Sequence, residues 1–433
     1  VNHLYHRGPD EGAIWHDESF FLGHRRLAII DLETGHQPMG NVSGNLVVTF
    51  NGEIYNYRDL KRELSDLGYS FRTNSDTEVL LNGYDAWGSE LPQRLRGMFA
   101  FAIADRKRRQ LFLARDRFGE KPLFYIEISG VVAFASELRP LTAMPNLDQR
   151  LDRQGLGGYL SLNYVPGDRT LMKGVRRVLP GHWMRFDRSN RQASERYWSL
   201  PPVVRTASRP SRPACEVTAK EWDERFDRAV RLSMTSDVPV GILLSGGIDS
   251  SLVAESAARQ CSLSKAFFLD FEEASFSEYE AASKVAKKLH IPLERVVLTS
   301  AALADFMTIV EHADEPLADS SCLAMWTLCR FASQDNKVVL GGDGGDELFG
   351  GYLTYQASHY HSKYISRLPL PIRRFLSTLA EYLPISERKV STSYKLWRFL
   401  RAADLPTQLA HLTWNGTWLP SQAGTFASDA GLR

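Results

Sequence analysis

The sequence predicts an α+β half followed by an α/β half with a parallel sheet, and three observations lead to this prediction. Up to about Tyr197, short apolar runs alternate with tight-turn residues, which is typical of paired strands. From about Thr218 onward, strand-like and helix-like segments alternate, and such repeated units favour a parallel sheet with right-handed crossovers. Between them, residues 199–217 are rich in Pro, Arg, Ser and Thr, so we expect domains over 1–198 and 218–433 joined by a linker.

The elements of the first half follow from its apolar patterns. Residues 45–55 alternate toward Asn51-Gly52, a dipeptide that is a strong signal for a hairpin turn. Two helical patterns come next, Tyr57–Leu67 and Asp76–Trp87. Two pairs of strands follow: Met98–Ala104 with Gln110–Arg115 around a charged turn, and Pro122–Ile128 with Val131–Ala135 around Ser129-Gly130. Together they predict an α+β fold in which one sheet packs on another.

The second half opens with a helix whose first turn, Thr218 to Glu221, has the pattern of a capping box. Strands are expected over Val238–Leu244, Ala266–Phe271, Arg295–Leu298 and Lys337–Leu340. Helices are expected over Ser250–Gln260, Ala302–Glu311 and Cys322–Ala332. Another helix is expected to open at a second capping box, Ser277–Glu280, and further helices are expected beyond Tyr352. In such sheets ligands bind at the carboxyl ends of the strands, so the loops that follow the strands are where a site is expected.

Composition excludes several classes of protein. The chain has 433 residues, 52 basic and 51 acidic side chains and a net charge of +1, so no global field attracts nucleic acid or an anionic membrane. The longest apolar runs are far below the roughly 18 residues of a membrane helix. The four cysteines, which form no C-x-x-C pair, are Cys215, Cys261, Cys322 and Cys329. So few cysteines favour a location in the reducing cytoplasm, and we expect them to be ordinary buried thiols.

The strongest motif is Ser245-Gly-Gly-Ile-Asp-Ser-Ser251, which follows a buried-looking strand and opens a helix. Its backbone N–H groups can surround phosphate oxygens. Ser245 and Ser250 can donate hydroxyl hydrogen bonds, and Asp249 is suited to hold Mg²⁺. The G-x-x-x-x-G-K-S/T pattern of Walker loops is absent, and a plain strand-to-helix turn is the alternative interpretation.

This loop resembles the pyrophosphate-binding loop of the ATP pyrophosphatase (PP-loop) family, whose members split ATP between the α- and β-phosphates and adenylate a substrate. The resemblance implies an adenine nucleotide α-hydrolase-like fold. It also implies ATP contacts by Leu243, Ser245, Gly246, Gly247, Asp249, Ser250 and Leu269. A second glycine-rich run, Leu340 to Tyr352, carries three carboxylates in five residues, which suits a metal or a base. Taken alone, that run is equally well a surface turn.

Together the two runs resemble the loops of glutamine-hydrolysing asparagine synthetases, whose second loop commonly reads S-G-E-G-x-D-E-x-F-G-G-Y. Here Gly341 replaces the Ser and Asp343 replaces the Glu. The resemblance implies that Gly341 and Gly342 contact ATP, that Asp249 and Asp346 hold Mg²⁺, and that Asp343 supports formation of the acyl-adenylate. Loss of the Ser hydroxyl removes one expected ATP contact, whereas Asp343 keeps the charge with a shorter reach.

The first half carries five motifs in the order found in class II glutamine amidotransferase domains. They are His6–Asp10, Gly23–Asp31, Asn51–Asn56, Ser75–Glu78 and Arg115–Leu123. The resemblance implies an αββα sandwich of the N-terminal-nucleophile type. Taken singly, Asn51-Gly52 is more often a hairpin turn and Arg26 a surface ion pair, but five ordered matches are hard to explain in that way.

The chemistry of these motifs fits glutamine. The planar fork of Arg26 can bind the α-carboxylate, and Glu53 and Asp76 can receive the ammonium or amide hydrogens. The side-chain NH₂ of Asn51 and the backbone N–H of Gly52 can form an oxyanion hole. The resemblance adds Leu27, Ala28, Ile29 and Ile30 as further glutamine contacts.

In that family the glutaminase nucleophile is a cysteine exposed at the N-terminus, and none of the four cysteines lies in residues 1–198. We therefore expect the chain to be truncated at both ends, without the N-terminal strand and its cysteine and without the last C-terminal segment. The resemblance implies that the full-length enzyme makes asparagine from aspartate, glutamine and ATP with Mg²⁺, through β-aspartyl-AMP. It implies no nucleic-acid or membrane partner and leaves a homodimer open.

Three other functions stay open at this point. One is a related amidotransferase or a β-lactam-synthetase-like enzyme that adenylates another carboxylate. The second is a tRNA-modifying PP-loop enzyme, and the third is a non-catalytic binding protein that keeps the fold. The run Asp314-Glu315-Pro316 with Asp319-Ser320-Ser321 either lines an aspartate pocket or caps the helix that follows.

Overall fold

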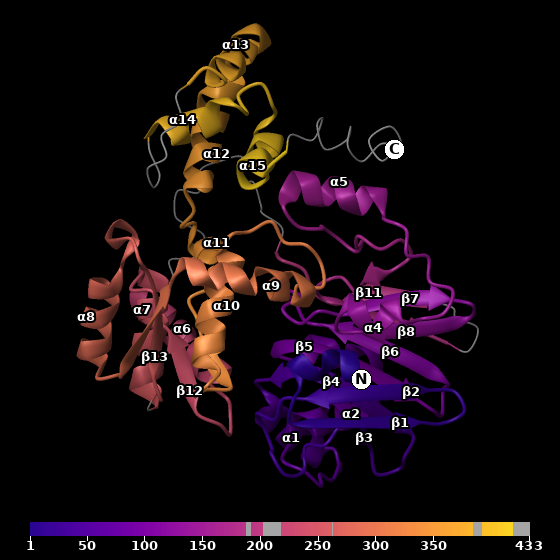
Figure 1. The fold of residues 1–433 in the computed structure, drawn as a ribbon. Coiled ribbons are helices and arrows are strands. Elements are labelled where there is room, and N and C mark those ends of the chain that lie inside the picture. The colour runs from indigo at the N-terminus through magenta and orange to yellow at the C-terminus, as the bar shows by residue number, and fades with distance from the viewer. Residues whose placement is uncertain (188–191, 202–217, 262, 384–391, 419–433) are drawn as a thin grey trace.

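A computed structural model describes residues 1–187, 192–201, 218–261, 263–383 and 392–418. Most of the expected linker, residues 202–217, and the last residues from 419 lie outside these ranges. Figure 1 shows the first half in indigo and magenta beside the second half in salmon and orange, with α9 and α10 between them. The helices α12 to α15 extend from one end of the second half.

A six-stranded antiparallel sheet forms the centre of the first half, in the order β11-β10-β6-β5-β4-β3. Two smaller antiparallel sheets accompany it, β1-β2 and β8-β7-β9. The strands are β1 Glu11–His16, β2 Phe21–Arg26, β3 Met39–Gly40, β4 Leu46–Ile54, β5 Gly97–Asp105, β6 Gln110–Arg115, β7 Phe124–Ile128, β8 Val131–Ala135, β9 Arg176–Arg177, β10 His182–Phe186 and β11 Gln192–Arg196. The pairs β5-β6 and β7-β8 occur where the sequence predicts them.

Each face of the six-stranded sheet is covered by a different layer. On one face, the helices α1 (Tyr57–Asp66) and α2 (Asp76–Trp87) bury Leu64 and Leu80 against Phe101. On the other face, Ala102 of β5 packs with Leu123 and with side chains of the smaller sheets. The remaining helical segments are η1 Asn2–Arg7, η2 Gly88–Glu90, α3 Leu91–Arg94, α4 Leu138–Thr142 and α5 Arg153–Leu162. The layers are therefore helices, sheet and sheet, as the alternating pattern predicts.

The hairpin turn expected at Asn51-Gly52 is wrong. β4 continues through both residues, and Asn51 lies opposite Ala100 while Gly52 lies opposite Phe99 of β5. Gly52 has φ +149, and a Cβ atom there would collide with the carbonyl oxygen of Met98. The glycine is needed for this close strand contact rather than for a turn, because only glycine adopts that conformation without strain.

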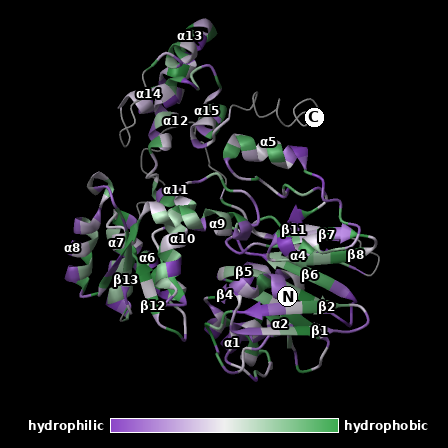
Figure 2. Cartoon of the chain, viewed as in Figure 1, coloured by the Kyte–Doolittle hydropathy of each residue, from purple (hydrophilic) through white to green (hydrophobic). Residues whose placement is uncertain are grey.

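The second half contains the expected parallel sheet, in the order β14-β13-β12-β15. Its strands are β12 Val240–Leu243, β13 Ala266–Phe271, β14 Leu293–Leu298 and β15 Val338–Leu340. One face packs against α6 (Ala219–Ser233), α7 (Ile248–Gln260) and α8 (Tyr279–Leu289), and the other packs against α10 (Ser321–Ala332). Figure 2 shows hydrophobic residues concentrated along β12 and β13, as expected for strands covered on both faces.

Local signals in this half were correct in part. The capping box at Thr218 and Glu221 is confirmed, since each side chain accepts the other's backbone N–H. The second capping box is wrong: α8 begins at Tyr279, and its N-cap residue Glu278 forms no side-chain cap bond. The helix expected over Ala302–Glu311 is divided into a 3-10 segment, η4 (Ser300–Asp305), and an α-helix, α9 (Phe306–His312). A further short 3-10 segment, η3, spans Ala274–Phe276. Of the thiols expected to be buried, Cys261 and Cys329 are exposed and Cys322 is half-buried, while Cys215 lies outside the described residues.

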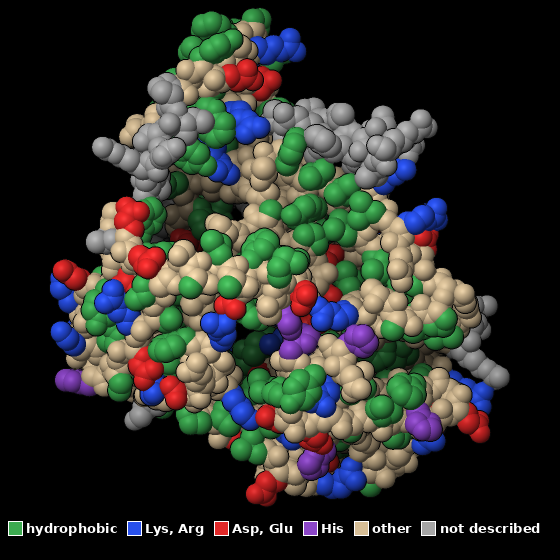
Figure 3. All heavy atoms as spheres, in the orientation of Figure 1, with side chains coloured by type: hydrophobic (Ala, Val, Ile, Leu, Met, Phe, Trp, Pro, Cys, Tyr) green, Lys and Arg blue, Asp and Glu red, His purple; other side chains and the backbone are tan. Residues whose placement is uncertain are grey.

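The helices beyond β15 complete the described chain. They are α11 Gly345–Phe349, α12 Leu353–Lys363, η5 Ile365–Arg367, α13 Leu370–Ala380, α14 Thr392–Leu400 and α15 Thr407–Asn415. Their small core contains Ala402, Ala410 and Trp414. Within the ranges that the structure describes, no helix combines the length and apolar character needed to cross a bilayer. Figure 3 shows acidic and basic side chains intermixed over the visible face, in keeping with the balanced charge.

Candidate active sites

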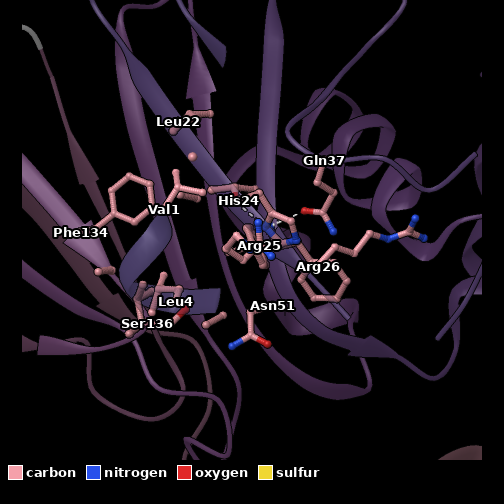
Figure 4. Close-up of a pocket in the computed structure, with 18 of the residues that line it drawn as sticks. Val1, Leu4, Leu22, His24, Arg25, Arg26, Gln37, Asn51, Phe134 and Ser136 are labelled. Atoms are coloured by element: carbon pink, nitrogen blue, oxygen red, sulfur yellow. Dashed lines mark hydrogen bonds between the residues drawn. The ribbon is translucent and has the colours of Figure 1, made fainter. Parts of the chain in front are cut away.

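A cavity of about 1000 Å³ in the first half brings together most of the residues predicted to bind glutamine. Its walls come from β2, β4, the start of α2 and η1, and Figure 4 shows several of them around Asn51. The predicted residues that line it are Arg26, Leu27, Ile29, Ile30, Asn51, Gly52, Glu53 and Asp76. Ala28 does not line the cavity. Its backbone N–H donates to Asp10 Oδ2 at 2.9 Å.

Asn51 presents an unused donor. Its side-chain Nδ2 is buried and has no hydrogen-bond partner among the described residues. A buried donor without a partner costs free energy, so its retention at a cavity wall indicates an acceptor that arrives with a ligand. Placed beside Gly52 on β4, this amide can stabilise negative charge on an oxygen atom.

Glu53 and Asp76 give the cavity a buried acidic wall. The two residues are 9% and 4% exposed. Burial raises the pKa of both carboxyl groups, and the nearby charge of Asp76 raises the pKa of Glu53 further. Asp76 Oδ2 accepts the N–H of Ile54 at 2.9 Å, whereas Glu53 Oε2 has no hydrogen-bond partner among the described residues. An arriving ammonium group would satisfy Glu53 and favour its charged form.

Arg26 is not the surface ion pair that its sequence context alone favours. It is 6% exposed, and its Nη2 donates to the carbonyl oxygens of Ile30 at 3.0 Å and Asp31 at 2.6 Å. Glu11 Oε2 lies 3.5 Å from its Nη1. The guanidinium therefore holds the loop after β2, and Figure 4 shows it extending away from Asn51. Its contact with a glutamine carboxylate stays a prediction.

Sequence reasoning passed over two further residues of this cavity. Lys121 lines it, and burial, with the nearby Arg7, lowers the pKa of its ammonium group. His24 Nδ1 lies 3.0 Å from Thr49 Oγ1, and burial lowers the pKa of His24 to about 4. Lys121 stands inside the motif Arg115–Leu123, in the loop between β6 and β7, so a lysine within a matched motif was the available signal.

The first glycine loop of the second half joins β12 to α7. Ser245 Oγ and Ser250 Oγ lie 2.9 Å apart, and the N–H of Gly247 donates to Ser245 Oγ at 3.2 Å. Gly246 has φ +80, and a Cβ atom there would lie 2.7 Å from the backbone nitrogen of Ala282 in α8. The loop is thus closed by its own serines and fitted against α8, with Gly246 required by both backbone angle and space.

The second glycine loop lies directly against the first. A Cβ atom on Gly342 would be 2.7 Å from the nitrogen of Ser250, and one on Gly345 would be 2.5 Å from Cγ of Asp249. A Cβ atom on Gly341 would be 3.0 Å from Asp343 Oδ2. Leu243 and Leu269, the other two predicted ATP contacts, pack in one apolar cluster on the neighbouring strands β12 and β13. The folded chain therefore gathers both predicted loops at the carboxyl edge of the parallel sheet.

The predicted Mg²⁺ ligands are carboxylates with different surroundings. Asp249 faces Gly345, whereas Asp346 turns back toward Gly351. The described residues contain no group of three or more His, Cys, Asp or Glu side chains that could hold a metal ion by themselves. Mg²⁺ in nucleotide sites is usually held by one or two carboxylates together with phosphate oxygens, so this donor set fits Mg²⁺ bound with ATP.

Asp314 and Glu315 connect the two halves. Asp314 accepts the backbone N–H groups of Leu138 and Arg139 at the start of α4, and Glu315 forms an ion pair with Arg177. The carboxylate of Asp314, which belongs to the second half, therefore caps α4 of the first half. The other interpretation of this run, an N-cap with its preceding loop before α10, is confirmed in part: Asp319 Oδ1 accepts the N–H of Ser321 at 2.9 Å, whereas the N-cap residue Ser320 forms no side-chain cap bond. A place for Asp314 and Glu315 in an aspartate pocket stays a prediction.

Comparison with known proteins identifies both halves. A glutamine amidotransferase domain model matches residues 1–198, and an asparagine synthase model matches residues 221–427. Asparagine synthetase (glutamine-hydrolyzing) 1 of Bacillus subtilis is 37% identical over 382 residues, which cover 88% of this chain and 59% of that protein. A Methanocaldococcus jannaschii protein, named provisionally as asparagine synthetase (glutamine-hydrolyzing) 2, is 32% identical over 89% of this chain and 76% of its own.

A third relative carries a different name. Amidase chry2 of Gibberella zeae is 32% identical over 82% of this chain and 55% of its own length. The chain spans about three fifths of the length of the first curated relatives that it matches. Among solved structures, an allosteric regulatory enzyme of purine biosynthesis aligns over 74% of this chain and 75% of its own, at 15% identity and a TM-score of 0.31.

Proposed function

Because the chain belongs to the family of glutamine-hydrolysing asparagine synthetases, we propose that it takes part in making asparagine from aspartate, with ATP as the energy source and glutamine as the nitrogen source. The observation that carries the proposal is the direct contact of the two glycine loops at Asp249 and Gly345. In this proposal the first half is an N-terminal-nucleophile αββα sandwich over 1–198, and the second is a PP-loop domain over 218–433.

The second half activates the acid. A carboxylate is a poor electrophile, so an oxygen of the aspartate β-carboxyl attacks the α-phosphorus of ATP, pyrophosphate leaves and β-aspartyl-AMP forms. N–H groups of the loop at Gly246 and Gly247 hold the departing pyrophosphate, and Asp343 stands beside the reacting groups. Asp249 and Asp346 would hold Mg²⁺, which neutralises phosphate charge when bound. Ammonia then attacks the acyl carbon and releases AMP.

The first half binds and polarises glutamine. Asn51 Nδ2 donates to the oxyanion that forms from the side-chain amide, and Glu53 and Asp76 receive the ammonium hydrogens. None of the four cysteines lies in residues 1–198, so these residues supply binding and oxyanion groups and no thiol nucleophile. The cytoplasmic location and the homodimer stay predictions.

The test is release of pyrophosphate from ATP and Mg²⁺ by the complete gene product, with and without aspartate, first with ammonia and then with glutamine. Asp249→Ala should lower this rate by about 100-fold or more, because it removes a metal ligand at the phosphates. Glu255→Ala is the matched control, because this half-buried position lies about two turns further along α7 and its carboxylate faces Arg259. Unchanged turnover in Asp249→Ala would refute the proposal.

The acceptor acid is the open part of the proposal. Gly341 and Asp343 depart from the usual loop of the family, and one relative is named as an amidase. Pyrophosphate release that does not require aspartate, but does require another carboxylic acid, would move the assignment to a related amidating or β-lactam-synthetase-like reaction.

A further inference from the structure

The second half holds the loop Leu27–Asp31 of the glutamine cavity at two points. Asp237 donates its backbone N–H to the carbonyl oxygen of Ile29 at 3.1 Å, and its Oδ2 accepts the N–H of Asp31 at 2.8 Å. Lys337 Nζ donates to Asp10 Oδ2 at 2.6 Å, and that same oxygen accepts the N–H of Ala28. The loop is therefore bound from outside by residues far away in the sequence.

The two anchors stand at the same edge of the parallel sheet. Asp237 precedes β12 and Lys337 precedes β15, and these strands are neighbours in which Val240 pairs with Val338. The opposite ends of the same two strands carry the glycine loops that begin at Ser245 and Gly341. At about 3.3 Å per residue, strands of three or four residues separate the two ends by only about 10–13 Å.

Asp31 transmits this contact to the cavity. It has φ +51, a left-handed conformation that residues other than glycine rarely adopt, so surrounding contacts must hold it there. Arg26 binds its carbonyl oxygen from inside, and Asp237 binds its N–H from outside. The Asp31 carboxylate accepts the N–H of Asn74, two residues before Asp76 of the acidic wall. A shift of Asp31 would therefore move both the Arg26 side and the Asp76 side of the cavity.

We propose that Asp237 and Lys337 are positioning residues for glutamine, so that the binding conformation of Leu27–Asp31 depends on how the ATP-binding half is seated. This inference rests on the proposed function and deepens it. The side chain of Asp237 contributes more than that of Lys337, because its carboxylate binds the backbone N–H of Asp31 in the loop directly. Lys337 acts only through Asp10, and this pair is 40% and 31% exposed and so contributes little alone.

The experiment measures KM for glutamine and, separately, synthesis with ammonia, in the complete gene product. Asp237→Ala should raise KM for glutamine about tenfold, and Lys337→Met about twofold to threefold. The rate with ammonia and the KM for ATP should stay unchanged. Asp237→Asn should recover part of the affinity, because its amide oxygen can still accept the N–H of Asp31.

Lys265→Met is the matched control. Lys265 precedes β13 at the same edge of the sheet as Lys337, but its ion pairs with Glu294 and Asp335 stay within the second half. This variant should therefore leave KM for glutamine unchanged.

An unchanged KM in the Asp237→Ala, Lys337→Met double variant would overturn the inference. So would an equal loss with ammonia, because the residues would then act on the nucleotide loops or on folding. Absence of pyrophosphate release by the parent protein would refute the proposed function instead. Calorimetric titration with glutamine would then still decide the inference through the ratio of dissociation constants of parent and variant.

Discussion

Gly345 and Asp249 are fitted so closely that a Cβ atom on Gly345 would lie 2.5 Å from Cγ of Asp249. The two residues follow different glycine loops, with Asp249 in the first turn of α7 and Gly345 opening α11. No side chain fits at Gly345 unless the carboxylate of Asp249 moves. Asp249, a proposed Mg²⁺ ligand, can therefore take its position only because residue 345 has no side chain.

Gly345→Ala should displace Asp249 and weaken ATP binding. Real Cβ atoms essentially never approach a neighbour to 2.5 Å, so either the carboxylate or the loop must shift. We expect KM for ATP in pyrophosphate release to rise about tenfold, since a misplaced ligand loses most of a charge-assisted contact. Gly40→Ala is the control, because its Cβ atom would meet nothing closer than 3.8 Å. A parent-like KM for ATP would contradict the proposed role of this contact.

Gly341 and Asp343 should behave as a pair. A Cβ atom on Gly341 would lie 3.0 Å from Asp343 Oδ2, so Gly341→Ser alone crowds the shorter carboxylate. We expect a loss of about threefold to tenfold in the rate of pyrophosphate release for this single variant. Adding Asp343→Glu, which restores the family's usual combination, should return the rate toward that of the parent. Single effects that simply add in the double variant would show that the two positions are independent.

The acidic wall should make the protein less stable as pH rises. A carboxyl group whose pKa is raised on folding holds its proton more tightly in the folded state. For Glu53 stability is therefore complete below its ordinary pKa of 4.5 and is lost progressively as pH rises toward the folded value. Glu53→Gln removes this penalty and should stabilise the protein by about 2 kcal/mol at pH 8 but hardly at pH 4.5.

Urea unfolding at both pH values measures this difference. Glu90→Gln, an exposed carboxyl on η2, should change stability at neither pH. Asp76→Asn should gain less than Glu53→Gln, because Asp76 also accepts the N–H of Ile54, and an amide accepts it less well. A pH-independent effect of Glu53→Gln would mean that folding does not raise the pKa of Glu53.

The sequence was sufficient for elements whose signals are local. The boundaries of α2 and β13 and the capping box at Thr218 were correct, because periodicity and caps act within one element. The Asn51-Gly52 turn failed because a long-range pairing with β5 overrides a local turn preference. The start of α8 failed because Glu278, rather than Ser277, is the residue before its first turn.

The sequence could name the loops of the site but not their contacts. Ser245 and Gly341 stand out by their own motifs. In contrast, no local pattern indicates that position 345 must lack a side chain to leave room for the carboxylate of Asp249. Asp237 and Lys337 carry no motif at all, and only the packing of the halves gives them partners at Asp31 and Asp10. Such roles depend on tertiary contacts, which periodicity and spacing do not report.

Asp116 should prove essential for the loop that presents Lys121 to the cavity. It is fully buried, and its carboxylate accepts four backbone N–H groups, those of Phe99, Phe118, Glu120 and Lys121, at 3.0–3.3 Å. Asp116→Ala leaves these donors without an acceptor, so we expect a loss of about 3–5 kcal/mol in the free energy of unfolding. Asp116→Asn keeps one acceptor oxygen but turns an NH₂ group toward N–H donors, so we expect a loss of about 1–3 kcal/mol.

Equilibrium unfolding in urea distinguishes these outcomes, with Asp66→Ala at the exposed end of α1 as the control. Because Phe99 lies opposite Gly52, the Asn variant should also raise KM for glutamine while leaving synthesis with ammonia intact. A loss below about 1 kcal/mol in Asp116→Ala would show that water replaces the carboxylate as acceptor. The loop would then be held by Arg115, which donates to the carbonyl oxygens of Gly119 and Lys121 at 2.7 Å.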